Sequence, residues 1–571
     1  MLNLFLKEGY SLGEDFIFSS ALGLGVLAYL VYAIGSAGLL FPSWVMALIF
    51  LLAAIALGPC WKFIRRLSEL NFLKAFVELS GFDKILLFIM LLIGGFCLFG
   101  ALTPEIGNDA LAYHIFIPKI FIAQHKISSI PFTRESLWPS LTQMLFTIGL
   151  IFKSHPLAKL FHYYFTVLSA AAVFSFTRRF FSKAEAFLAT ALFCSAPGIF
   201  MQSTYAYVDL ALCFYAFTAF YAFLLWQGNK IKPGIALAGI FCGLALSVKL
   251  LGGIAMVILA AMLVWQSYVK KERPVKNLSI FVLSAFIACC VWYIRSWVVL
   301  GNPVFPFLDT VFKSGWPAEF REAYGFTRHS YGILRLPWDL VMNLEKFGGE
   351  QIGVIFLAFL PFLAFLNFKD KTVRLLLVFM LAYGGLWFWV DQNIRFLFPD
   401  FPVIFILIGL GFWGYAKKYK AAFLKAVLLL LILFSAALSF YYNLDAIKLR
   451  LGLSSPRDYL IKKERTFPVA EYVNRNLPKD CVIIAYNESR GYYFERDFFV
   501  YGVLKLSFKE NNAKAYLEQL AQKRSLYILI NSGKQIDDPD ITALINNKTL
   551  VFKIKREVEE GKTGFYLLYK I

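Results

Sequence analysis

The sequence predicts an all-α polytopic membrane protein of about thirteen transmembrane helices with a small C-terminal α/β domain outside the membrane. Three observations lead to this fold class. Of the 571 residues, 59% are hydrophobic and only 16% are charged, whereas soluble domains average about 45–50% apolar and about 25% charged residues. Apolar runs of about 20 residues, long enough to cross a bilayer, recur along most of the chain. After Tyr442 these runs shorten to the length of strands.

The apolar runs define the expected membrane-spanning segments. We expect spans at about 16–40, 42–61, 84–102, 157–177, 184–200, 205–226, 234–250, 252–268, 277–299, 351–367, 372–390, 396–415 and 421–441. A further apolar piece at 139–152 is short for a span, and we expect it to form a helix that lies in the membrane interface. The eight cysteines show no CxxC spacing, so neither a metal ribbon nor a redox site is indicated.

Basic residues indicate the orientation of the chain. The formal net charge of +20 comes from short basic clusters between the apolar runs, not from a continuous stripe of the kind that binds nucleic acid. The clusters fall on alternate connections, as expected when Lys and Arg stay on the cytoplasmic side. They are Lys62/Arg65/Arg66/Lys74, Arg178/Arg179/Lys183, Lys230/Lys232, Lys270/Lys271/Arg273/Lys276, Lys369/Lys371/Arg374 and Lys417/Lys418/Lys420. This pattern predicts a cytoplasmic N-terminus and an external C-terminal region.

Three regions follow from this topology. Residues 1–82 form two N-terminal transmembrane helices and a cytoplasmic loop, residues 83–442 a transmembrane domain with long external loops at 103–156 and 300–350, and residues 443–571 an external α/β domain. In the last region we expect helices at 468–476 and 513–523, strands at 482–486 and 526–530, and a hairpin of 550–555 with 564–569. Long ordered loops are usually functional, so any chemistry is expected on the external side.

The first external loop places a carboxylate within a few residues of the membrane exit. Either Asn108 or Asp109 caps the short helix that follows, or Asp109 serves at the mouth of a cavity as a general base or metal ligand. The same loop contains Glu105, Tyr113 and His114 as candidate substrate-binding residues. His329 in the second loop is a further candidate.

Charged residues near the outer ends of spans form the second set of candidates. Asp209 is a candidate catalytic carboxylate or a member of a structural ion pair, with Lys249 as its potential partner. Arg295 either binds substrate or snorkels to the interface. Arg395, in a tight external connection, is suited to phosphate because its planar fork donates two parallel hydrogen bonds. Arg328, His329, Arg335 and Lys346 form either a loose cationic set or a solvated loop face.

Several of these motifs occur in an order that resembles the GT-C superfamily. They are the acidic first loop with its His114-Ile-Phe-Ile-Pro-Lys119 continuation, Tyr207-Val-Asp209, Trp292-Tyr-Ile-Arg295-Ser-Trp297 running into Gly301-Asn-Pro-Val-Phe-Pro306, Leu336-Pro-Trp338, and Arg395-Phe-Leu-Phe-Pro399. GT-C proteins are multi-spanning glycosyltransferases that use polyprenyl-phosphate-linked sugars. The likeness covers about residues 84–440. Over this range the chain is similar to protein O-mannosyltransferases and the lipid A aminoarabinose transferase.

The resemblance implies transfer of a sugar from a polyprenyl-phosphate donor to an external acceptor, with inversion at the anomeric carbon. It implies that Asp109 is catalytic or metal-binding, so a divalent metal ion is a candidate cofactor, although many members have two adjacent acids where this chain has Asn108-Asp109. Cations such as Arg395, Lys249 and Arg295 would stabilise the donor phosphate. The alternatives are a glycan ligase or polymerase that uses a polyprenyl diphosphate, and a lipid or solute transporter, whose paired broken helices we do not find in the sequence.

The predicted orientation is tested with reporter fusions after residue 445. A reporter that is active only outside the cytoplasm should be active there, because the basic clusters alternate consistently only with an external C-terminal region. Activity of a cytoplasm-only reporter at this position would contradict the orientation and, with it, an external active site.

Overall fold

The computed structural model describes residues 10–130, 133–228, 233–314, 332, 334–419, 421–507, 512–533, 536–559 and 562–571. The chain divides into two compact units. The helical unit consists of Met1–Leu102, Pro139–Tyr293 and Phe326–Ile447. The mixed unit consists of Thr103–Trp138, Ile294–Gly325 and Lys448–Ile571. Residues 103–138 of the first external loop therefore group with the C-terminal domain.

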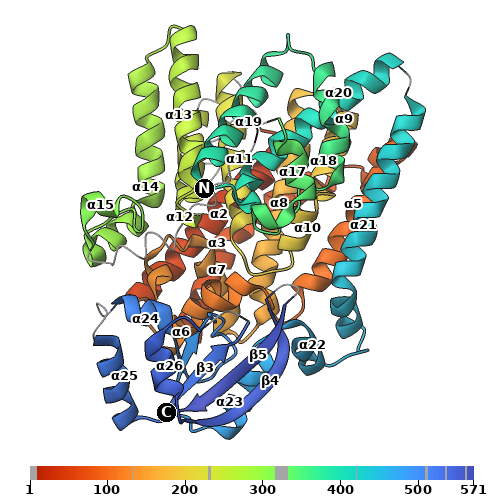
Figure 1. Ribbon diagram of the computed structural model, residues 1–571. Helices are drawn as coiled ribbons and strands as arrows, with labels where there is room; N and C mark the ends of the chain where they lie inside the picture. The colour runs from red at the N-terminus through yellow and green to blue at the C-terminus, as the bar shows by residue number, and fades with distance from the viewer. Residues whose placement is uncertain are drawn as a thin grey trace. The chain divides into compact units, whose positions relative to one another are not determined.

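The helical unit contains helices that are long and apolar enough to cross a membrane (Figure 1). Ten such segments occur among the described residues. They are α2 (Leu12–Ser36), α3 (Pro42–Ser68), α5 (Gly81–Ala101), α8 (His155–Phe180), α11 (Asp209–Gln227), α13 (Gly252–Val269), α14 (Pro274–Leu300), α19 (Lys371–Val390), α21 (Ala422–Arg450), and η5 (Ile394–Asp400) joined to α20 (Phe401–Tyr419). Each coincides with a predicted span, and the polytopic helical fold class is confirmed.

Three further predicted spans are shorter or broken. Residues 184–200 form α9 (Lys183–Cys194) and α10 (Pro197–Gln202), separated where Pro197 cannot continue the helix. Residues 351–367 form α18 (Val354–Phe359) and the 3₁₀ segment η4 (Leu360–Phe365), and α12 (Gly234–Val248) has only 15 residues. Apolar length thus predicted where these segments lie but not their breaks. The remaining short helices of this unit are α4 (Phe72–Val77), α7 (Leu141–Ile151), α17 (Leu336–Met342) and η3 (Leu344–Phe347).

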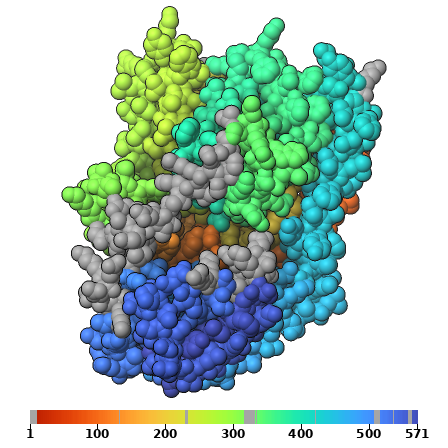
Figure 2. All heavy atoms as spheres, viewed as in Figure 1, coloured from red at the N-terminus to blue at the C-terminus, as the bar shows by residue number. Residues whose placement is uncertain are grey.

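Burial separates central helices from those with exposed apolar surfaces. The apolar central stretch of α11 is entirely buried and that of η5–α20 is 89% buried, whereas the corresponding stretch of α3 is only 6% buried. The apolar side chains Phe423, Leu430 and Phe434 of α21, the cyan helix at the right edge of Figure 2, are exposed. Such surfaces suit contact with lipid chains. α7 occupies the position of the expected interfacial helix, but every one of its 11 residues is buried, so it packs into the helical unit and has no exposed apolar face.

The mixed unit combines short helices with a five-stranded sheet. From the first loop come η1 (Ala110–His114), a π-helical turn, α6 (Phe116–Ala123) and η2 (Arg134–Leu137), and from the second loop α15 (Asp309–Phe312). The C-terminal part contributes α22 (Pro456–Lys463), α23 (Phe467–Asn476), α24 (Tyr501–Ser507), α25 (Asn512–Lys523), α26 (Pro539–Ile545), β1 (Val482–Tyr486), β2 (Asp497–Val500), β3 (Leu526–Asn531), β4 (Thr549–Glu559) and β5 (Lys562–Lys570).

The sheet order is β2-β1-β3-β5-β4. β1 pairs in parallel with both β2 and β3, while β5 pairs antiparallel with β3 and β4. One face of the sheet packs with α24, α25 and α26 around Val482, Ile528 and Leu517. The predicted helices, strands and hairpin of this region are confirmed, and β2, α22, α24 and α26 are additional.

Two glycines allow α12 to pack closely against α14. A Cβ on Gly239 would lie 2.3 Å from the carbonyl oxygen of Phe281, and one on Gly243 would lie 2.3 Å from that of Ala285. Real Cβ atoms essentially never approach other atoms this closely. The pair, four residues apart, is typical of close helix contacts in membranes.

This contact makes the stability of the protein sensitive to one methyl group. We expect Gly243→Ala to destabilise the protein by about 1–3 kcal/mol, because two backbones must move apart. Gly95→Ala is the matched control, since a Cβ there has nothing within 4 Å. Thermal unfolding in detergent measures both variants. Equal midpoints for the two would show that the α12–α14 contact tolerates separation.

Candidate functional site

Three of the predicted site residues meet in the helical unit. The Nζ atom of Lys249 donates to Oδ1 of Asp209 at 3.0 Å. A guanidinium nitrogen of Arg395 lies 3.2 Å from Oδ2 of the same carboxylate. The ion pair between Asp209 and Lys249 that the sequence suggested is therefore confirmed, and Arg395 joins it. We call these residues the cationic triad.

Asp209 is the first residue of α11, where a negative charge is favoured by the helix dipole and by free backbone N–H groups. The start of this helix is held by His162 of α8. The Nε2 atom of His162 accepts a hydrogen bond from the backbone N–H of Leu210 at 3.2 Å. Its Nδ1 atom lies 2.8 Å from the carbonyl oxygen of Tyr205 and 3.1 Å from that of Gln202. These partners assign the neutral tautomer with the proton on Nδ1.

Lys249 ends α12 in an extended conformation, and α13 begins three residues later. The tight reversal depends on Gly252, whose N–H donates to the carbonyl oxygen of Lys249 at 2.9 Å. A Cβ on Gly252 would lie 2.5 Å from the carbonyl carbon of Ala245. The backbone therefore presents Lys249 at the junction of two helices, where its amine reaches α11.

Hydrogen bonds from backbone N–H groups to side-chain oxygens fix the turn that carries Arg395. Asp391 accepts the N–H of Asn393 at 3.0 Å, and Asn393 accepts that of Arg395 at 3.1 Å. The indole N–H of Trp387 donates to the carbonyl oxygen of Asn393 at 2.7 Å. Gly348, with φ +84°, passes so close that a Cβ would lie 2.6 Å from the amide nitrogen of Asn393. The connection that carries Arg395 is thus a rigid turn.

The electrostatics of the triad favour an anionic ligand. Two cations and one carboxylate leave one net positive charge on these three side chains. The Asp209 side chain is fully buried, whereas those of Lys249 and Arg395 are 25% and 14% exposed. The ring of Phe396 lies 4.2 Å from the Lys249 amine, and that of Tyr207 lies 4.9 Å from the Arg395 guanidinium. The Asp209 carboxylate is therefore shielded from solvent, while the two cations remain partly accessible to a ligand phosphate.

Four other predicted site residues lie in the first loop, which belongs to the mixed unit. The side chain of Asp109 makes no capping hydrogen bond to the helical turn that follows it, so the interpretation of Asp109 as a cap is wrong. Glu105 is fully buried, and its Oε1 atom accepts the N–H groups of Ile106 at 2.8 Å and Gly107 at 2.6 Å. Glu105 therefore closes the turn that precedes Asp109.

None of the remaining candidates makes a recorded contact with the triad among the described residues, and Tyr113, His114 and Arg295 belong to the mixed unit. Tyr113 and His114 form an aromatic pair with ring centroids 4.2 Å apart, and Tyr113 also meets Trp138 edge to face. Arg295 belongs to the mixed unit and donates to the carbonyl oxygen of Ser128 at 3.0 Å. His329 and Arg328 lie outside the described residues. Of the second-loop cations, Arg335 pairs with Asp339 at 3.1 Å.

A metal centre has no obvious set of ligands in the part of the chain that the structure describes. Within it, no group of three or more His, Cys, Asp and Glu side chains could hold a metal ion. Asp109 and its neighbours therefore do not form a multidentate cluster there, and we assign no catalytic step to a metal.

Comparison with known proteins relates this fold to others. The chain resembles the crystal structure of ArnT from Cupriavidus metallidurans bound to undecaprenyl phosphate, with a TM-score of 0.56, 12% identity, and coverage of 85% of this chain and 97% of that one. The apo form of the same protein gives a TM-score of 0.57 at 13% identity, with the same coverage. The chain has the GT-C fold. The resemblance found in the motifs is thereby confirmed.

Sequence comparisons agree with this fold. The family described as dolichyl-phosphate-mannose-protein mannosyltransferase matches residues 152–315, which include Asp209 and Lys249. An uncharacterized protein of Shigella flexneri is 25% identical over 144 residues, which are 25% of this chain and 76% of that protein. The sequence likenesses therefore cover only part of the chain, and the structural likeness relates its fold to that of ArnT.

Sequence reasoning missed His162 and the aromatic partners of the cations. His162 sits within an apolar run, and the only available signal was that a histidine is rare inside a membrane helix. Tyr207 and Phe396 are each adjacent in sequence to a member of the triad or two residues from it. Their roles follow from backbone geometry that no local pattern specifies.

His162 should be required for the position of Asp209. We expect His162→Phe to lower the unfolding temperature and to weaken donor binding, because it leaves buried backbone groups at the start of α11 without partners. Thr218→Val is the control. It removes a buried hydroxyl of α11 whose recorded hydrogen bond, to the Phe214 carbonyl oxygen at 2.6 Å, lies within the same helix. Donor binding as strong in His162→Phe as in the control would refute this role.

Proposed function

We propose that this protein is a glycosyltransferase that moves a sugar from a polyprenyl-phosphate donor to an acceptor outside the cytoplasm. The cationic triad carries this proposal. Its partly exposed cations suit a phosphodiester, and their surplus positive charge stabilises the negative charge that grows on the phosphate as the glycosyl bond breaks. ArnT, which has a similar fold, binds undecaprenyl phosphate, and the matching family takes its name from a dolichyl-phosphate sugar.

The proposed reaction is a single displacement. An acceptor hydroxyl oxygen attacks the anomeric carbon, the bond from that carbon to the phosphate oxygen breaks, and the electron pair leaves with the polyprenyl phosphate. Asp109 takes the proton of the hydroxyl as general base. Attack from the face opposite the phosphate inverts the configuration at the anomeric carbon. No metal ion is needed to balance this step.

Within the triad the roles differ. Arg395 and Lys249 bind the donor phosphate, and Asp209 positions them, because both of its oxygens face cations. We assign the proton transfer to Asp109 for this reason. The acceptor is a lipid, a glycan or a protein in the cell envelope of a prokaryote, and the enzyme lies in the cytoplasmic membrane with its N-terminus inside. Mass spectrometry of envelope lipids, polysaccharides and proteins from cells with and without the gene tests the proposal, which predicts the loss of one glycoform.

Arg395→Lys tests the phosphate contact. The variant keeps the charge but loses the planar fork, so we expect the apparent affinity for the lipid donor to fall by about tenfold while the protein remains folded. Arg457→Lys, in an exposed ion pair with Glu471, is the control. Donor titrations of the purified variants measure the difference. Identical donor kinetics for Arg395→Lys and the parent would remove Arg395 from the donor site.

Asp109→Asn tests the general base. The amide cannot accept a proton near neutral pH, so we expect turnover to fall by about 10²–10⁴ with an unchanged unfolding temperature. Asp480→Asn, at an exposed position, controls for the loss of one carboxylate from the same unit. Turnover is measured with a defined polyprenyl-phosphate sugar and its acceptor. Turnover of Asp109→Asn within a few-fold of the parent would move the catalytic assignment to Asp209.

A further inference from the structure

A segment of the C-terminal domain, residues 488–498, contacts the first loop on both sides of Asp109. The hydroxyl of Tyr493 donates to the carbonyl oxygen of Glu105 at 2.7 Å. The backbone N–H of Tyr492 donates to the carbonyl oxygen of Leu111 at 3.3 Å. The two acceptors lie four residues before Asp109 and two residues after it. We call residues 488–498 the clamp segment.

The clamp segment also holds the helix that follows Asp109. The amine of Lys119 in α6 donates to the carbonyl oxygens of Tyr492 at 2.7 Å and Phe494 at 2.6 Å. Burial lowers the pKa of this amine to about 8. A Cβ on Gly491 would lie 2.8 Å from the ring of Phe116, so the segment has no room for a side chain at this point. Every one of these bonds involves a main-chain group, which makes them sensitive to position.

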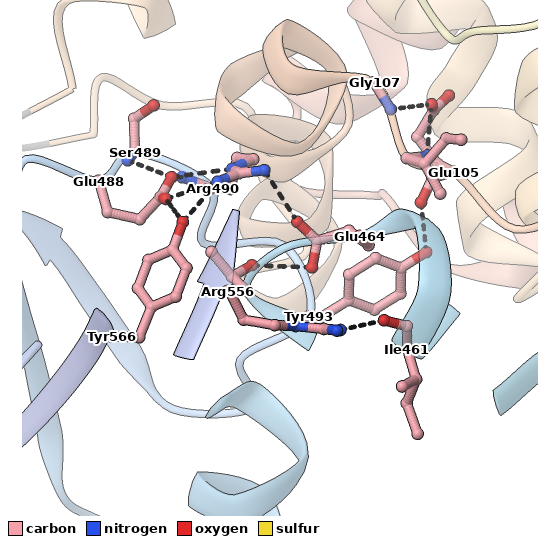
Figure 3. A network of polar contacts seen from close by, with 12 residues as sticks. Glu105, Gly107, Ile461, Glu464, Glu488, Ser489, Arg490, Tyr493, Arg556 and Tyr566 are labelled. Carbon is pink, nitrogen blue, oxygen red and sulfur yellow. Dashed lines mark hydrogen bonds and ion pairs between the residues drawn. The ribbon is translucent and has the colours of Figure 1, made fainter. Parts of the chain in front are cut away.

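A buried ionic network attaches the clamp segment to the rest of the C-terminal domain (Figure 3). The guanidinium of Arg490 donates to both oxygens of Glu488, at 2.9 and 2.7 Å, and to the hydroxyl of Tyr566 in β5 at 2.8 Å. It also lies 3.3 Å from Glu464. Burial opposes ionisation of Glu488, but the charge and hydrogen bonds of Arg490 outweigh it and lower the pKa of Glu488 to about 2. The Glu488–Arg490 pair therefore stays charged at neutral pH.

Figure 3 shows both ends of this connection. Arg490 and its carboxylates join the segment to the sheet, and Tyr493 extends from the same segment to the Glu105 turn. The turn itself is closed by the Glu105 carboxylate on the N–H of Gly107. Hydrogen bonds at both ends of the 490–493 backbone thus connect β5 to the backbone that precedes Asp109.

We propose that the C-terminal domain positions the catalytic loop, with Tyr493 and Lys119 as positioning residues that hold Asp109 through its flanking backbone. This inference rests on the proposed role of Asp109 as general base. The domain then acts on the chemical step without touching the substrate, and weakening the clamp segment lowers kcat and leaves the KM for the donor unchanged.

Tyr493→Phe tests the proposal, because it removes one hydrogen bond and little volume. Tyr472→Phe is the matched control, since its hydroxyl donates at 3.1 Å to a carbonyl oxygen of β4, at Val551, and not to the loop. Hydrogen exchange of a peptide covering residues 106–119 in the full-length protein should rise about fivefold in Tyr493→Phe, as expected for the loss of one hydrogen bond, and should stay unchanged in the control. Lys119→Met should give the same result as Tyr493→Phe.

The outcomes separate this proposal from the proposed function. Faster exchange together with a lower kcat and an unchanged donor KM supports it. Unchanged exchange in Tyr493→Phe, or faster exchange without any loss of kcat, overturns it. If the parent protein shows no sugar transfer at all while exchange rises in the variant, the proposed function fails and the coupling between domain and loop remains.

A second, independent feature is a groove of about 600 Å³ between α13 and α19 of the helical unit. Its lining is mostly apolar and includes Met262, Trp265 and Gln266 from α13, and Lys371, Arg374 and Leu375 from α19. The side chain of Gln266 is 95% buried, and its Oε1 atom has no hydrogen-bond partner among the described residues. A buried amide oxygen of this kind is costly unless a ligand supplies a donor.

Charge at the rim indicates the class of ligand. Lys371 and Arg374 are the first and fourth residues of α19, and both are exposed. Basic pockets between transmembrane helices suit lipid phosphates, with acyl chains along the apolar walls. We infer that the groove binds an anionic glycerophospholipid, with its phosphate at Lys371 and Arg374 and a headgroup hydroxyl donating to Gln266.

Native mass spectrometry with added phosphatidylglycerol and phosphatidylcholine of matched chains tests this site. The parent should retain phosphatidylglycerol preferentially. Both Gln266→Leu and the double variant Lys371→Gln/Arg374→Gln should retain about tenfold less phosphatidylglycerol than the parent, as expected for charge-assisted contacts. Lys417→Gln/Lys418→Gln, which removes the same charge from the end of α20, is the control. Equal retention of the two lipids, equal loss in the control, or displacement by a polyprenyl phosphate would each overturn the assignment.

Discussion

The arrangement of the helical unit around the candidate site depends on the burial of the Asp209 carboxylate. A fully buried charge in a membrane protein is costly unless it is paired and hydrogen-bonded. The ion pairs with Lys249 and Arg395 at 3.0 and 3.2 Å meet this condition. They bring together the start of α11, the α12–α13 junction and η5, so one electrostatic requirement fixes the mutual position of three segments that are far apart in the sequence.

The same requirement explains why the supporting backbone is so constrained. A cation can pair with Asp209 only if its connection is rigid, and both connections rely on glycines where a side chain would collide. Gly252 allows α13 to begin directly after Lys249, and Gly348 packs against Asn393 beside Arg395. His162 supplies the third constraint, because its Nε2 atom bonds the first turn of α11 and its Nδ1 atom bonds the segment that precedes this helix. The surplus positive charge then faces outward on partly exposed side chains, as a phosphate ligand requires.

The mixed unit uses a buried ion network for a different purpose. Arg490 is 8% exposed and contacts two carboxylates and a phenol. Removing one member would leave the others buried and unpaired, so the network specifies one conformation of the clamp segment. That segment in turn bonds the loop around Asp109. The grouping of the first loop with the C-terminal domain therefore has a specific set of contacts behind it.

The sequence alone determined the features that depend on composition and local pattern. Apolar length predicted the position of each span-length helix among the described residues, and apolar runs of strand length predicted β1, β3 and the β4–β5 hairpin, because burial in lipid or in a sheet acts on each segment separately. Charged residues at the ends of spans singled out Asp209, Lys249 and Arg395 for the same reason, since a charge at that depth needs a partner. Tertiary structure decided which partner each charge has, where helices break, as at Pro197, and that α7 is buried on all sides. It also decided that Glu105 closes a turn and that Asp109 is not a cap. These depend on contacts between segments distant in sequence, and no local pattern encodes the geometry of such contacts.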